Sequence, residues 1–135
     1  MNFNDFLKEG FVKKVEINTL RARSLIKSSK QAVETATQIP LTETTLKTIL
    51  RELYEGLRGY CEAIGFLKGY KFLNHESITC FLEDILNEKL ISSKFDRYRK
   101  LRNGVNYYGN DVSEETIKVA LKEIPKIIKS LEKHT

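Results

Sequence analysis

Apolar side chains recur at intervals of three and four residues along most of the chain, which is the spacing of one buried face on an α-helix. Runs of this kind lie at about residues 18–38, 42–70, 76–87, 92–109 and 113–131. The longest run is apolar at Leu46, Ile49, Leu50, Leu53, Tyr54, Leu57, Tyr60, Cys61 and Ile64. We therefore expect an all-α protein, an up-down bundle of four main helices plus short helices.

Residues with known capping preferences mark the expected helix ends. Asn4 would begin a short helix at residues 5–9, and residues 11–17 would form an extended or irregular connector. A turn is expected at residues 71–74, and no pairing of strands is expected. The caps predicted for the four main helices are Asn18, Thr42, Ser92 or Ser93, and Ser113, with Gly109 as a left-handed C-terminal cap and a kink at Pro125.

Four glycines interrupt the longest predicted helix, although each costs up to about 1 kcal/mol relative to alanine in a helix. They are Gly56, Gly59, Gly65 and Gly69. Such a cost suggests that a partner helix packs closely there, and a second subunit could supply it. Alternatively, Gly65 and Gly69 only mark the end of the helix.

Length and composition predict one domain, residues 1–135, in which residues 1–17 form the short N-terminal helix and connector. No apolar run approaches the roughly 20 residues of a membrane span, and no basic and then apolar leader is visible, so a cytoplasmic location is expected. Cys61 and Cys80 sit at apolar helical positions and are expected to be buried thiols rather than a disulfide. No Cys or His spacing suggests a metal site, and no cofactor is expected.

The formal net charge is +5, and the positive charges are clustered. Lys94, Arg97, Arg99, Lys100 and Arg102 are opposed only by Asp96 within the same stretch. Such a cluster could attract a polyanion such as RNA, or it could be a solvated helix face.

The same cluster belongs to the stretch FDRYRKLRNGVNYYG at residues 95–109. Phe95, Tyr98, Leu101, Val105 and Tyr108 form one apolar stripe of a helix, and Arg102 and Asn106 lie one turn apart beside it. This pattern can place polar groups where helices meet. The alternative is an ordinary core helix whose arginines are solvated.

The sequence GFLKGYKFLNHESITCFLED followed by RYRKLRNGVNYYG resembles the HEPN family from about residue 18 to residue 131. The resemblance implies a HEPN-like helical bundle, a homodimer, and a minimal nucleotidyltransferase as a possible partner. Many members of this family are metal-independent ribonucleases. Their motif is an Arg, commonly followed by Asn, and then a His a short distance later. The Arg stabilises phosphate charge and the His transfers protons while RNA is cut through its own 2′-hydroxyl.

Arg102 and Asn103 match the Arg and Asn of that motif, but Tyr107, Tyr108 and Gly109 occupy the positions where the His would follow. A phenol is a poor general base at neutral pH. His75 precedes another helix, and we expect it to be a loop or cap histidine. It could replace the missing histidine only if the fold brings it to Arg102.

Three functions remain open from the sequence. The first is a dimeric module that binds or regulates RNA or a nucleotide through Arg99, Arg102, Asn103 and Asn106. The second is a divergent ribonuclease toxin of a toxin–antitoxin pair, in which Arg102 and Tyr107 are catalytic. The third is a structural dimer that uses this helix only as an interface. The resemblance to the family also makes Tyr107 and Tyr108 candidates for adenylylation by the nucleotidyltransferase.

Overall fold

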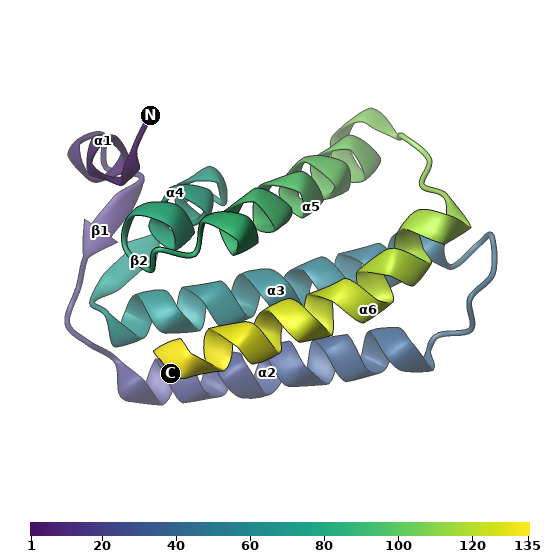
Figure 1. Cartoon of the computed structure of the whole chain (residues 1–135), viewed down its shortest axis with the longest axis horizontal. Helices are drawn as coiled ribbons and strands as arrows, with labels where there is room; N and C mark the ends of the chain where they lie inside the picture. The colour runs from purple at the N-terminus through teal and green to yellow at the C-terminus, as the bar shows by residue number, and fades with distance from the viewer.

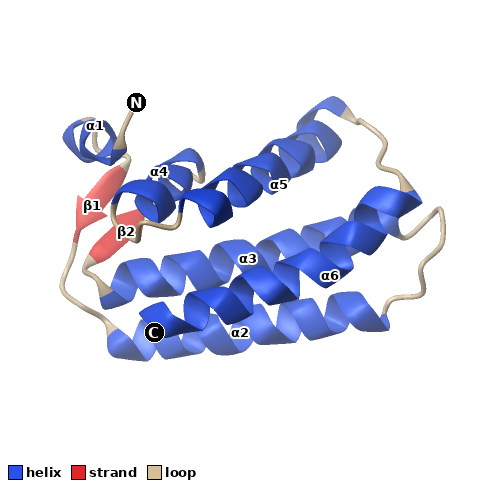
Figure 2. Cartoon of the chain, viewed as in Figure 1, coloured by secondary structure: helices blue, strands red, loops and turns tan.

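The computed structural model describes residues 1–135, and the chain is mostly helical, in agreement with the predicted all-α class (Figures 1 and 2). Two short strands and a final 3₁₀ turn complete it. The elements are α1 (Phe3–Lys8), β1 (Val12–Lys14), α2 (Thr19–Gln38), α3 (Leu46–Leu67), β2 (Tyr70–Phe72), α4 (Glu76–Asp84), α5 (Lys89–Tyr108), α6 (Glu114–Leu131) and η1 (Glu132–His134).

Three long helices, α2, α3 and α6, run side by side, and α5 packs against α3 and α4 (Figure 1). The short elements α1, α4, β1 and β2 gather at one end of this arrangement (Figure 2). None of the helices is both long and apolar enough to cross a membrane.

Helix α3 forms the centre of the core, because it contacts α2, α5, α6 and β2. The apolar face predicted from its sequence is confirmed, since Ile49, Leu50, Leu53, Leu57 and Ile64 are fully buried. Burial of that much apolar surface is the dominant favourable contribution to folding. The core fixes α3 in place, and α3 carries Tyr54 beneath the cavity described below.

The glycines of α3 allow close packing within the chain. A Cβ added to Gly56 would lie 2.6 Å from Val33 Cγ2, in α2, and one added to Gly65 would lie 2.5 Å from the Phe72 ring, in β2. The close partner that these glycines predicted is therefore α2 and β2 of the same chain. They do not argue for a second subunit.

The expectation that no strands pair is wrong. β1 and β2 pair antiparallel, with Val12 opposite Phe72 and Lys14 opposite Tyr70. Gly69 turns the chain out of α3 with a φ of +83°, and its carbonyl accepts a hydrogen bond from Val15 N at 2.9 Å. Each strand has only three residues, which is too short for the alternation of apolar and polar residues to stand out.

The capping residues Asn18, Ser113 and Gly109 are confirmed, and Gly109 has a φ of +65°. Three other helix starts differ from the prediction. α1 is capped by Asn2, and α3 starts at Leu46 because the preceding threonines form a hydrogen-bonded turn. α5 starts at Lys89, so that Ser92 lies inside it. α6 continues from Glu114 to Leu131 through Pro125.

Candidate functional site

A cavity of about 360 Å³ lies between α5 and the loop that leads from β2 into α4. α5 contributes two arginines to its wall, and the loop contributes a histidine. The lining residues are Leu73, Asn74, His75, Glu76, Arg99, Arg102, Asn103 and Tyr107. Four of these, Arg99, Arg102, Asn103 and Tyr107, are among the site residues predicted from the sequence.

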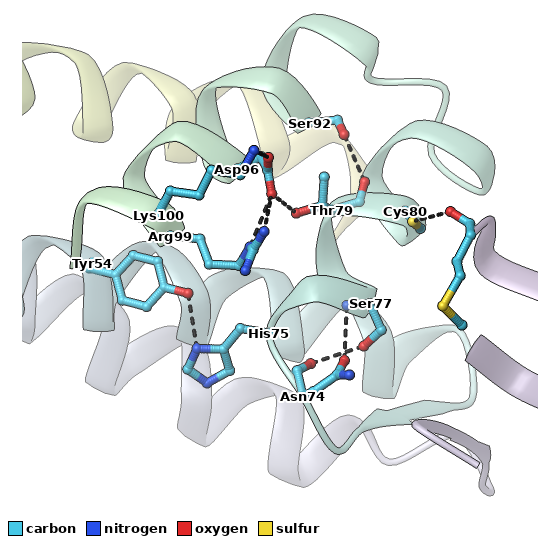
Figure 3. A network of polar contacts seen from close by, with 11 residues as sticks. Tyr54, Asn74, His75, Ser77, Thr79, Cys80, Ser92, Asp96, Arg99 and Lys100 are labelled. Carbon is cyan, nitrogen blue, oxygen red and sulfur yellow. Dashed lines mark hydrogen bonds and ion pairs between the residues drawn. The ribbon is translucent and has the colours of Figure 1, made fainter. Parts of the chain in front are cut away.

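The loop before α4 is held at both ends. Leu73 N donates a hydrogen bond to Phe11 O at 2.8 Å, which extends the pairing of β1 with β2. Asn74 Oδ1 then accepts from Ser77 N at 2.9 Å, and Ser77 Oγ donates to Asn74 O at 2.9 Å (Figure 3). These bonds cap the start of α4. The strand pair missed by the sequence analysis is therefore what anchors the loop that carries His75.

His75 lies beside Arg102, although 27 positions separate them in the sequence. Its Nδ1 atom is 3.4 Å from Arg102 Nη2 and 3.0 Å from the Tyr54 hydroxyl (Figure 3 shows the Tyr54 contact). As expected for a loop or cap histidine, His75 lies in the loop before α4, at the N-cap position of that helix. Its side chain makes no capping hydrogen bond, however, because Asn74 Oδ1 accepts from Ser77 N. The fold brings a histidine to the motif arginine from another element.

Burial lowers the pKa of His75 to about 4, and the positive charges of Arg58 and Arg102 add to this effect. At pH 7 the ring is therefore neutral. Since a guanidinium only donates hydrogen bonds, the contact with Arg102 requires Nδ1 to be an acceptor and places the ring proton on Nε2. Nε2 makes no hydrogen bond within the chain.

The guanidinium of Arg102 has no carboxylate partner. It lies over the Tyr54 ring, with Cζ 4.8 Å from the centroid, and Nη1 donates to Asn103 Oδ1 at 3.2 Å. A cation over an aromatic ring gains about 0.5–1 kcal/mol at partly exposed sites. This contact orients Arg102, but it leaves a half-buried positive charge without a counter-ion at the wall of a cavity.

Arg99, one turn earlier on α5, is held by Asp96. Its Nε and Nη2 atoms both donate to Asp96 Oδ1, at 3.0 and 2.8 Å (Figure 3). Burial of Asp96 disfavours its ionised form, but hydrogen bonds from Arg99 and Lys100 outweigh this effect and hold its pKa below the usual value. Asp96 also accepts from Thr79 Oγ1 at 3.2 Å, which ties α5 to α4. Arg99 is thus fixed at the cavity wall, and its charge is partly compensated by Asp96, which also pairs with Lys100.

Tyr54 is the buried support under both residues. Burial raises its pKa above the ordinary value, and the positive charge of Arg102 opposes this shift less strongly. The phenol therefore stays neutral and donates its proton to His75 Nδ1. The nearby Arg58 is paired with Glu55 and Glu62, and its charge still acts on His75.

The structure does not bring Asn106 into the cavity. Its side-chain oxygen accepts from Arg51 Nε at 2.8 Å, on the side of α5 that faces α3. Tyr107 lines the cavity with 71% of its surface exposed, whereas Tyr108 is 80% exposed and does not line it. Both tyrosines are accessible to a modifying enzyme.

Sequence reasoning missed Tyr54 and Asp96 as parts of this site, and it made the contact of His75 with Arg102 depend on the fold. One signal could have found the pair of Tyr54 and His75. Tyr54 occupies the buried face of the longest helix, and a buried hydroxyl needs a hydrogen-bond partner. The only histidines are His75 and His134.

A larger cavity of about 630 Å³ lies between α5 and α6, and five of its thirteen lining residues are lysines. It contains no histidine or arginine, and its two carboxylates, Glu88 and Glu123, pair with Lys133 and Lys94. We therefore assign the candidate site to the smaller cavity, where the polar groups converge. The structure holds no cluster of three or more His, Cys, Asp or Glu side chains that could bind a metal ion, and Cys61 and Cys80 are both free thiols.

The fold and this cavity define an all-α protein with a cationic pocket built around Arg102 and His75. Comparison with known family models, with curated proteins and with solved structures found no match to the chain. The function that follows is therefore argued from the geometry of the pocket.

Proposed function

We propose that the protein is a HEPN-type module that binds a phosphate group of RNA or of a nucleotide in the cavity around Arg102. The observation that carries the proposal is the guanidinium of Arg102, which is half-buried, faces a cavity and has no carboxylate partner. A charge in this position is costly unless it is paired, so an incoming anion would supply the missing partner.

The other groups in the cavity suit a phosphate in particular. A guanidinium presents a planar fork of donors that matches phosphate oxygens, and Arg99 adds a second positive charge one turn away. The Nε2–H of His75 and the amide nitrogen of Asn103 are donors with no partner within the chain. Donors from α5 and from the loop thus surround one space.

The proposal includes a homodimer and a minimal nucleotidyltransferase as partner, on the strength of the resemblance in sequence. In such a dimer the cavities of two chains would form one composite cleft for RNA. The size of the particle in solution, measured by light scattering, tests the dimer. Incubation with ATP and the partner enzyme followed by intact mass measurement tests adenylylation of Tyr107 or Tyr108.

Binding of a fluorescently labelled single-stranded oligoribonucleotide to the Arg102→Ala variant tests the phosphate site. Because hydrogen bonds to charged groups are worth about 1.5–3 kcal/mol, the affinity should fall about 10- to 100-fold. Arg23→Ala is the matched control, because it removes the same charge from an exposed position on α2, away from the cavity. Equal affinities for the two variants would contradict the proposal.

A divergent endoribonuclease is the second candidate, favoured by the 3.4 Å contact between His75 and Arg102. This contact places an imidazole beside the phosphate-binding group without help from Tyr107. However, a histidine whose pKa is about 4 is a weak proton acceptor at neutral pH, and its Nδ1 atom is already engaged. For this reason we place binding first.

Cleavage would leave 2′,3′-cyclic phosphate ends on the RNA. Loss of cleavage in both His75→Ala and Arg102→Ala would establish the nuclease. Cleavage that persists in both variants would come from a contaminant, and intact RNA would leave the binding function as proposed.

A further inference from the structure

Two apolar side chains line the Arg102 cavity, and both are exposed to solvent. Tyr107, on α5, is 71% exposed, and Leu73, in the loop before α4, is 48% exposed. Tyr107 makes no hydrogen bond and buries little surface, so packing of the core does not explain its presence. The polar groups of the cavity, Arg99, Arg102 and His75, lie along the same hollow.

Tyr107 lies one helical turn beyond Asn103 on the same face of α5, which is about 6 Å along the helix axis. A phosphate held by Arg102 would therefore leave room for a ribose beside Asn103 and for a base at the Tyr107 ring. The flat face of a nucleobase gains free energy by stacking on an aromatic side chain, and this gain is largely independent of the base. A paired base within a helix has no free face to offer.

From this arrangement we propose that Tyr107 is a stacking platform for an unpaired nucleobase, so that the cavity takes a nucleoside monophosphate unit and not a bare phosphate. Leu73 forms the apolar wall from the loop side. The proposal rests on the phosphate site described above and names its ligand class. The unit could come from a single-stranded RNA or from a free nucleotide, because both carry the same phosphate, ribose and base.

Affinities for three ligands test the platform: ribose 5-phosphate, AMP and a short single-stranded oligoadenylate. AMP should bind about tenfold more tightly than ribose 5-phosphate, because stacking of one base on an aromatic side chain typically gives a gain of this size or larger. Tyr107→Leu should remove this advantage, and Tyr107→Phe should keep it, since the ring and not the hydroxyl is required. Tyr108→Leu, in the adjacent exposed tyrosine outside the cavity, should keep it as well.

Equal affinities of the wild-type protein for AMP and ribose 5-phosphate would overturn the proposal that Tyr107 is a stacking platform. It would also be overturned if Tyr107→Leu and Tyr108→Leu reduced the affinity for AMP equally. In that event the phosphate site survives if binding of ribose 5-phosphate still depends on Arg102. If none of the three ligands binds, both proposals fail. Binding of oligoadenylate more tightly than AMP supports the platform and assigns RNA as the source, whereas equal binding supports it and assigns a free nucleotide.

Discussion

The hydroxyl of Tyr54 lies 3.0 Å from Nδ1 of His75 and joins the buried centre of α3 to the loop before α4. The ring of the same tyrosine supports the guanidinium of Arg102 from α5. One buried side chain thus orients the two polar groups that meet in the cavity. Two helices and a loop that are distant in sequence are brought into one site at this point.

Removal of the hydroxyl in Tyr54→Phe should lower the free energy of unfolding by about 1 kcal/mol, because a partly buried hydrogen bond is lost and Nδ1 of His75 loses the shorter of its two hydrogen bonds. Urea denaturation measures this change. Tyr60→Phe is the matched control, since Tyr60 is also buried in α3 and its hydroxyl makes no hydrogen bond within the chain. If the two variants lose equal stability, Tyr54 does not hold His75.

The stability of the protein should depend on His75 in a defined range of pH. The pKa of His75 is about 4 in the folded chain, against 6.5 for an unperturbed histidine. Between these values the unfolded chain binds more protons than the folded chain. The contribution of His75 to the free energy of unfolding is therefore fully present above about pH 6.5 and is lost as the pH falls toward 4.

A comparison of the wild-type protein with His75→Gln isolates this effect. The difference between their free energies of unfolding should shrink as the pH is lowered from 7 to 5. The groups that face His75 are Arg58, Arg102 and Arg99, which lower its pKa, and Glu55, which raises it. Asp96 and Glu123 have pKa values below the usual range for carboxylates, and both residues are present in the two proteins. Their titration therefore cancels in the difference between the wild-type protein and His75→Gln. A difference that does not change with pH would show that His75 is not shielded from protonation.

Gly56 and Gly59 should respond in opposite ways to substitution by alanine. A Cβ at Gly56 would lie 2.6 Å from Val33 Cγ2 and 2.9 Å from the backbone oxygen of Ser29, so Gly56→Ala should destabilise the protein by about 1–3 kcal/mol. At Gly59 the nearest such atom is Ser29 Cβ at 3.9 Å. Gly59→Ala should therefore be neutral or stabilising by up to about 1 kcal/mol, because alanine is the better helix former.

Thermal denaturation of the two alanine variants measures this contrast. It also tests why the chain tolerates glycines in its central helix. If Gly56→Ala were as stable as Gly59→Ala, the close approach of α2 to α3 would not be what requires glycine.

Local patterns predicted the helices well, because each depends on residues close together in sequence. The apolar stripe of α3 and the caps at Asn18, Ser113 and Gly109 are examples. The strands β1 and β2 escaped detection because each is three residues long and its partner is remote in sequence. The start of α5 was missed because Ser92, which resembles a cap, instead donates to Thr79 O at 2.7 Å from within the helix.

For the candidate site too, the sequence predicted the residues that are close together in the chain and missed those that only the fold brings together. Arg99, Arg102, Asn103 and Tyr107 share one helix, so their spacing in sequence was enough to group them. Asn106 has the right spacing from Arg102 but bonds to Arg51 instead, because the packing of α3 against α5 offers it a partner there. His75 could not be assigned by spacing, since the turn at Gly69 and the strand pair that deliver it to Arg102 are tertiary features.

Nuclear magnetic resonance of the arginine side chains, during titration with adenosine 5′-monophosphate, tests the central claim most directly. The claim is that Arg102 is the phosphate-binding group of this protein. The Nε–Hε signals of Arg102 and Arg99 should shift together and saturate, while that of Arg23, exposed on α2, should stay in place. An Arg102 signal that does not move, or that moves no more than that of Arg23, would contradict the claim.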